Sequence, residues 1–342
     1  DEKVPGRDKF VETIVKKSRI IRLFEDSRER ITALSIEAID KPLPLIPWRE
    51  NQHALKKLRR ETQSRLNKAP IGATLEITAE FNQQLKTFIH LLFEQCVSFV
   101  GKKIPFEYVL LGFGSIAREE ACPYSDLECG FLVGADFENN KVHADIILNL
   151  FKLCIITLGE TPSEKNSCIK SGLRFDDLYT PFNEKIKLLG TAEAIAGAHI
   201  DEEKKVDFRI LSVIQTACIL SKSDKGNELY KKFQDTFNES LDKNKLREAF
   251  AKNVISENAA NQELMPFALD ALTIRSIKEN LLRPFVFLFT ALNSSEALNE
   301  LTSLKRLEKL QQLGKINPVI ADMLKLYFGF ALRLRYLAHF HY

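Results

Sequence analysis

Asp126 and Glu128 lie two positions apart, shortly after the pair Gly114-Ser115. Residues two apart in a β-strand face the same side, so a strand would direct both carboxylates into one pocket. Two carboxylates that close repel each other unless a positive charge lies between them. Mg²⁺ prefers one or two carboxylates together with phosphate oxygens and water. The spacing therefore predicts a metal site, with Mg²⁺ as the expected ion and Mn²⁺ as an alternative.

The residues before the acidic pair suit a phosphate group. Gly114 and Ser115 would form a turn whose backbone N–H groups and hydroxyl can contact phosphate oxygens. Arg118 would lie one turn further on if a helix follows, where its forked guanidinium suits phosphate. Such turns, and an Asp-Leu-Glu strand, also occur as ordinary loop and surface chemistry. The order of turn, arginine and acidic pair between two strands favours a ligand site.

The elements that must position this motif are also readable. Short apolar runs predict buried strands at residues 108–111 and 129–133, on either side of it. A helix is predicted for about residues 138–158, and a further strand for residues 173–175. A long helix before the first strand should pack on the sheet. Its apolar residues at helical spacing are Phe81, Leu85, Phe88, Leu92 and Phe99.

The motif resembles the nucleotidyltransferase signature of the DNA polymerase β superfamily, a Gly-Ser pair followed by an acidic–hydrophobic–acidic triplet. With Arg118, Glu120, Pro123 and Ser125, it is most similar to the branch of the protein-PII uridylyltransferases and their bacterial relatives. The resemblance covers roughly residues 75–340. Later segments that resemble this branch are 171–177, 189–193, 207–209 and 277–284. Two departures are Glu128, where relatives commonly have Asp, and Ala117, where they often have Gly.

The resemblance implies an enzyme that transfers a nucleoside monophosphate from a nucleoside triphosphate to an acceptor hydroxyl. Asp126 and Glu128 would bind Mg²⁺, and Gly114, Ser115 and Arg118 would bind the nucleotide. Members of the superfamily generally use a third carboxylate from a later strand. We expect it at Asp176, with Asp177 as the alternative, and an acidic turn without a catalytic role is the other interpretation.

The protein-modifying enzymes of this branch favour a protein side chain, such as tyrosine, as the acceptor. A small-molecule nucleotidyltransferase of the antibiotic-modifying kind stays open, as does a catalytically inactive regulatory or scaffold protein on the same fold. ATP and UTP are both candidate substrates. The regulatory domains of true PII uridylyltransferases are not visible, which argues against PII as the acceptor. A net charge of +3, without a base-stacking motif, argues against a nucleic-acid partner.

We expect an α+β fold, with a small mixed-sheet nucleotidyltransferase core that is preceded by helices and followed by an α-helical bundle. The predicted domains are an N-terminal helical region (1–73), a nucleotidyltransferase domain (74–200) and a C-terminal helical bundle (201–342). The first region contains predicted helices at residues 8–40 and 48–68. Its basic run, residues 56–60, is interpreted as a solvated helix face, with an acidic partner or a membrane surface as the alternative.

Three apolar stripes predict the helices of the bundle, and Pro284 should kink or begin the helix that contains it. The stripes are Val206, Ile210, Val213, Ala217 and Leu220; Leu281, Phe285, Leu288 and Leu292; and Ile320, Leu324, Tyr327, Ala331 and Leu334. The last stripe reaches the chain end without a helix stop, as expected for a piece of a longer protein.

Composition points to a cytoplasmic protein without a membrane span. No apolar run approaches the length that crosses a bilayer. The six cysteines form no CxxC pair, so we expect reduced thiols, with Cys96 and Cys218 in the core.

Overall fold

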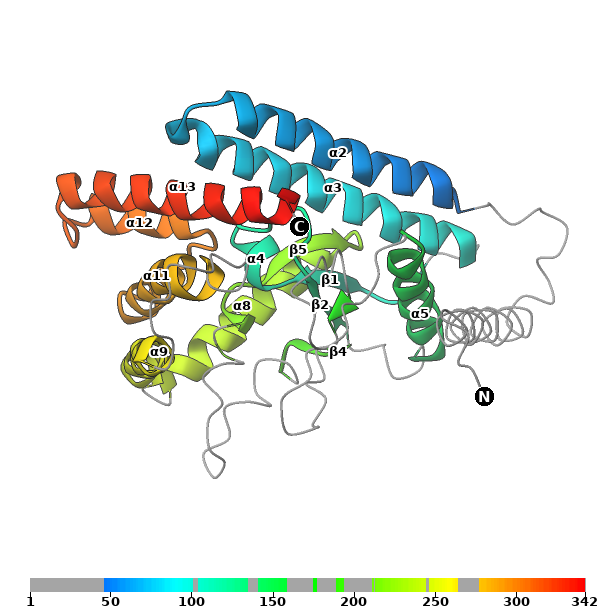
Figure 1. Cartoon of the computed structure of the whole chain (residues 1–342). Helices are drawn as coiled ribbons and strands as arrows, with labels where there is room; N and C mark the ends of the chain where they lie inside the picture. Colours follow the sequence, from blue (N-terminus) through cyan, green and yellow to red (C-terminus); the bar gives the residue numbers. More distant parts are fainter. Residues whose placement is uncertain are drawn as a thin grey trace, which may run out of the picture.

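The computed structural model describes residues 46–100, 104–134, 141–158, 175–176, 189–193, 211, 213–243, 246–263 and 277–341. It is an α+β structure in which helices surround one small mixed sheet (Figure 1). The helix predicted for residues 8–40 lies outside the described residues, as do Asp177 and Cys168. Within the described ranges, no helix has the length and apolar character needed to cross a membrane.

The sheet has the strand order β3-β2-β1-β5, and β4 also pairs with β2. β1 (Tyr108–Gly112) and β2 (Leu127–Val133) are antiparallel, which confirms the two strands predicted around the motif. β5 (Cys218–Lys222) pairs antiparallel with the other edge of β1. The short strands β3 (Phe175–Asp176) and β4 (Leu189–Gly190) both run parallel to β2.

The strand β5 corrects a helix prediction. Ala217 and Leu220 were placed on a helical stripe of the bundle, but Leu220 lies in β5 and Ala217 directly precedes it. A short apolar run reads equally well as a buried strand or a helix segment, because periodicity alone does not separate them. In this chain the segment forms a strand, because the buried backbone groups at the edge of β1 need hydrogen-bond partners. A segment from beyond residue 200 therefore completes the sheet.

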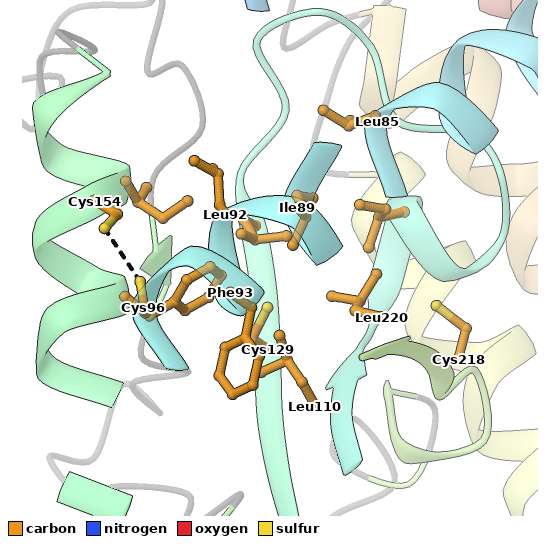
Figure 2. Close-up of a cluster of buried hydrophobic side chains, with 14 of the residues drawn as sticks. Leu85, Ile89, Leu92, Phe93, Cys96, Leu110, Cys129, Cys154, Cys218 and Leu220 are labelled. Atoms are coloured by element: carbon orange, nitrogen blue, oxygen red, sulfur yellow. Dashed lines mark hydrogen bonds between the residues drawn. The ribbon is translucent and has the colours of Figure 1, made fainter. Parts of the chain in front are cut away.

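The predicted long helix is α3 (Thr74–Val100), and it packs on the sheet. Phe93 of α3 is fully buried at the centre of this contact (Figure 2). Its ring centroid lies 5.7 Å from that of Tyr108 and 6.0 Å from that of Phe131, on β1 and β2. It lies 5.5 Å from the ring of Phe151 on α5 (Lys141–Thr157), the helix predicted for residues 138–158. Phe93 thus joins α3, α5 and the sheet.

The described cysteines are free and buried. The sulfur atoms of Cys96 and Cys154 are 3.2 Å apart between α3 and α5 (Figure 2), and this contact, together with burial, raises the pKa of Cys96. Burial raises the pKa of Cys122 and that of Cys218 to about 11. Thiols held neutral in this way are poor nucleophiles. Cys96 and Cys218 are core residues, as predicted.

Two long helices lie along α3. The predicted helix α2 (Trp48–Lys68) packs on it, and a 3-10 turn, η1 (Ile71–Ala73), joins the two. α13 (Pro318–His341), near the chain end, contacts both α2 and α3 (Figure 1). Arg333 of α13 donates hydrogen bonds to the carbonyl oxygens of Leu66 and Ala69. It therefore satisfies backbone groups at the C-terminal end of α2, where a cation is favourable.

The remaining helices are α8 (Gly226–Lys243), α9 (Leu246–Glu263), a π-helical segment η3 (Ile277–Leu282), α11 (Arg283–Ser295) and α12 (Ser303–Gln312). Of these helices, α8 packs on the sheet, α9 packs on α11, and α12 lies beside α13 (Figure 1). Pro284 lies in the first turn of α11, so it begins a helix as predicted.

The last predicted helix exists, but only part of its predicted stripe is covered: Ala331 is buried and Leu324 packs on the core. Ile320 and Tyr327 of the predicted stripe are 53% and 57% exposed. The adjacent residues Phe328 and Leu332 are buried instead, against the rest of the bundle. The prediction failed in part because α13 is apolar on more than one side, and only tertiary packing selects the side that is covered.

Replacing Phe93 by alanine should lower the free energy of unfolding by about 3–5 kcal/mol, because it leaves a cavity where four elements meet. Leu91→Ala is the matched control on α3: Leu91 is 53% exposed, so its replacement should cost less than about 1 kcal/mol. Urea denaturation followed by circular dichroism measures both. Equal losses in the two variants would contradict the core described above.

Candidate functional site

The Gly-Ser turn follows β1 directly and lies against Glu128. After Phe113, α4 (Gly114–Ala117) makes a single helical turn. Gly114 has a φ of 60°, and a Cβ atom added there would overlap the Glu128 carboxylate oxygen Oε2. The Phe113 N–H donates a 2.9 Å hydrogen bond to the Glu128 carbonyl, which fixes the two segments side by side. Only glycine fits at this position, because it tolerates the left-handed conformation and has no side chain.

Asp126 and Glu128 take slightly different positions from those predicted. Glu128 lies within β2, and Asp126 precedes the strand by one residue. Both are half-buried. The Asp126 oxygen Oδ1 is buried and has no hydrogen-bond partner in the part of the chain that the structure describes. A buried carboxylate oxygen without a partner is costly, and a bound cation would remove that cost.

The later strand brings a third acidic residue to the same place. β3 contains Asp176, and its Cα is paired with that of Glu128 in the parallel register between β3 and β2. The chain positions of Asp176 and Glu128 are therefore neighbours on the sheet, although they lie far apart in sequence. The competing residue, Asp177, lies outside the described residues.

The described donors at this position suit Mg²⁺. No group of three or more His, Cys, Asp or Glu side chains that could hold a metal occurs in the described ranges. Two carboxylates are what a Mg²⁺ site needs when phosphate oxygens and water complete the coordination. The pair Asp126 and Glu128 therefore fits the predicted ion.

Arg118 lies near the turn but has a protein partner. It is the C-cap of α4, and its Nε donates a 2.9 Å hydrogen bond to the buried carboxylate of Glu120. The other oxygen of Glu120 accepts a hydrogen bond from Ser303 at the start of α12. Glu120 thus ties the turn to α12 and fixes the direction of Arg118. A guanidinium has five N–H donors, so this bond leaves others for a ligand.

Four basic residues that were not predicted as part of the site lie near it: three contact Tyr124 or Ser125, and the fourth lies on η3, which packs on α13. We call Arg59, Lys278, Arg335 and His339 the basic cluster. Arg335 donates a 3.3 Å hydrogen bond to the hydroxyl of Ser125, the residue before Asp126. The Tyr124 ring has the Arg59 guanidinium 4.2 Å from its centroid and stacks with His339 at 6.3 Å.

The members of the basic cluster influence one another because they are buried. Burial and the positive charges of Arg335, Lys278 and Arg59 lower the pKa of His339 to about 3, so its imidazole is neutral at neutral pH. The pKa of Lys278 is lowered by burial and by Arg335 and Arg283, and Glu128 opposes this shift. Lys278 lies on η3, which packs on α13.

Three sequence signals for this cluster were available. Arg335 and His339 are four residues apart, which places them on one face of a helix. Arg59 belongs to the run at 56–60 that we interpreted as a solvated face, and its burial corrects that interpretation for this residue. Lys278 lies in the segment 277–284, which resembled a known branch without being given a role.

Comparison with known proteins identifies the family of most of the chain. A family model described as the N-terminal domain of SidM matches residues 48–302. This family is not the protein-PII uridylyltransferase branch that the sequence motifs resembled, so that part of the prediction was wrong. No curated protein matched the chain.

The buried His339 should make stability depend on pH. Between its ordinary pKa of 6.5 and the folded value of about 3, the unfolded chain binds a proton here that the folded chain does not. The free energy of unfolding should therefore fall as pH is lowered through this window. His339→Gln should flatten this fall, as measured by urea denaturation at several pH values.

His53→Gln is the control for this experiment, because His53 is an exposed histidine on α2. It should keep the pH dependence of the unchanged protein. The assignment of the effect to His339 fails if both variants give the same profile.

Proposed function

This chain belongs to the family of the SidM N-terminal domain, and from the geometry of its site we propose that it transfers a nucleoside monophosphate from a nucleoside triphosphate to an acceptor hydroxyl. The observation that carries the proposal is the meeting of three segments at Glu128. Its carboxylate lies against Gly114, and its backbone is paired with Asp176. Asp126, whose Oδ1 has no hydrogen-bond partner among the described residues, lies two residues away in the chain. The turn at Gly114 would bind phosphate, the segment of Asp126 and Glu128 would bind the metal, and the strand of Asp176 would act on the acceptor.

Asp126 and Glu128 are the residues that would hold Mg²⁺, or Mn²⁺ in its place. Bound metal would neutralise the negative charge that develops on the leaving pyrophosphate. The half-buried position of both carboxylates supports this role, because they are screened from water but reachable by a ligand.

The other residues would bind and orient the substrates. Backbone N–H groups at Gly114 and Ser115, and the Ser115 hydroxyl, would bind phosphate oxygens, and Arg118 would add positive charge. The acceptor oxygen would form a bond to the α-phosphorus, while the bond to the β-phosphate oxygen breaks and pyrophosphate leaves. Asp176 would take the proton of the acceptor hydroxyl as general base.

We propose a protein side chain, such as tyrosine, as the acceptor, and either ATP or UTP as the donor. Incubation with each labelled nucleoside triphosphate, Mg²⁺ or Mn²⁺ and a cell lysate reports activity, base and acceptor together. Label in protein would support a protein acceptor, whereas label in small molecules would support the antibiotic-modifying type. An absence of label in every fraction would favour an inactive scaffold on this fold.

Asp126→Ala should abolish metal-dependent nucleotide binding and transfer. The ligand-free variant should be at least as stable as the unchanged protein, because a buried oxygen without a partner is removed. Calorimetry with a non-hydrolysable nucleotide, with Mg²⁺ or with a chelator, measures binding, and urea denaturation measures stability. Asp322→Ala, at an exposed position of α13, is the control and should change neither. Normal transfer by Asp126→Ala would mean that the site is elsewhere.

Asp176→Asn should separate chemistry from binding. The substitution keeps size and hydrogen-bonding reach but removes basicity, so transfer should slow by roughly 10²–10⁴-fold. Affinity for the Mg²⁺-nucleotide should stay near normal, because Asp126 and Glu128 are intact. Asp177→Asn is the comparison and should have little effect. The reverse pattern in single-turnover assays would assign the base to Asp177, and unchanged rates in both variants would reject a base on this strand.

A further inference from the structure

We propose that Lys278, Arg335 and His339 form an anion site that binds the polyphosphate tail of the nucleotide. The inference rests on the proposed function, and it adds residues from the helical bundle to the site. Arg335 and His339 lie on α13, beyond the residues that the family model matches.

The first support is that polar nitrogen atoms of the proposed site have no hydrogen-bond partner within the described residues. Arg335 and His339 are each 5% exposed. The Nε of Arg335 and both ring nitrogens of His339 are buried and make no hydrogen bond within the described residues. Buried polar atoms of this kind are rare in native proteins, because each costs free energy that a ligand can recover.

The second support is a local excess of positive charge. Arg59 and His339 both contact the Tyr124 ring. Arg335 lies one turn before His339 on α13, and Lys278 lies on η3, which packs on α13. Glu279, next to Lys278 in sequence, is shared between Lys278, on which its charge acts, and Arg283, with which it forms an ion pair. Lys278 itself makes no ion pair with the described residues, although it is half-buried. Like charges that are buried together repel unless an anion lies between them.

The third support is the position of the cluster next to the acidic motif. Lys278 lies on η3, which packs on α13, the helix of Arg335. Arg335 is hydrogen-bonded to Ser125, which precedes Asp126. A ligand that contacts both the carboxylates, through a cation, and the basic cluster must carry several negative charges over a short length. The triphosphate of a nucleotide has this form.

The roles of the two cations differ. Lys278 offers a compact ammonium with three donors and can follow a phosphate as it moves. Arg335 is held in place by Ser125 and offers its free Nε in a fixed direction. His339 is neutral and offers one N–H donor without adding charge.

Binding of inorganic tripolyphosphate to the full chain, measured by calorimetry with and without Mg²⁺, tests the proposal. Lys278→Gln and Arg335→Gln should each weaken binding by about ten- to hundredfold, the range expected for a lost charge-assisted contact. Lys278→Arg should keep most of the affinity, because it keeps the charge. Lys325→Gln removes a lysine of α13 that pairs with Glu308, and it should bind like the unchanged protein.

Equal affinity in Lys278→Gln and the unchanged protein would overturn the proposal, and so would an equal loss in Lys325→Gln. If Arg335→Gln fails to fold, as judged by circular dichroism, the half-buried Lys278 carries the test alone. If tripolyphosphate binding depends on Lys278 but the protein transfers no nucleotide, the anion site is supported and the proposed function is rejected. If Lys278→Gln binds tripolyphosphate normally and transfer still requires Asp126, the anion site is rejected and the proposed function is kept.

Discussion

The close approach of Gly114 to the Glu128 carboxylate is the constraint on which the candidate site depends. Antiparallel pairing of β1 with β2 brings the end of one strand to the start of the other, and the Phe113 hydrogen bond to Glu128 holds them there. The turn can then pass the carboxylate only if residue 114 lacks a side chain and accepts a positive φ. Any larger residue would separate the turn from the acidic pair, and phosphate and metal chemistry would lose their common position.

Several buried polar groups near this contact lower the stability of the folded protein instead of adding to it. The oxygen of Asp126 and the nitrogens of Arg335 and His339 are buried without partners among the described residues. Buried polar atoms without a partner among the described residues also occur elsewhere, for example at Asn253, Asn293 and Ser294. The atoms of Asp126, Arg335 and His339 differ from these in their position, because Arg335 is hydrogen-bonded to Ser125, the residue before Asp126, where a ligand could complete their interactions.

The sequence predicted what depends on neighbouring residues. The strands around the motif, the helices α2, α3 and α5, and the start of α11 at Pro284 follow from local patterns of apolar residues and proline. The position of Asp176 opposite Glu128 agrees with the strand expected before it. Three features depend on packing between distant segments and were missed in whole or in part: the strand β5, the covered side of α13, and the burial of Arg59. A local sequence pattern does not show which strand edge is paired, which helix face is covered or which cation is buried, because each depends on a distant segment.

One consequence of α13 concerns synthesis on the ribosome. Tyr336 donates a hydrogen bond to the carbonyl of Ala121, which lies 215 residues earlier in the chain. This bond helps to hold the loop that leads to Asp126 in position. At ordinary rates of translation, that interval takes roughly 10–40 s. During this time the acidic motif has been made but the helix that holds its loop has not. The loop can therefore reach its final position only after α13 has been made, and chaperones can bind the nascent chain during this interval.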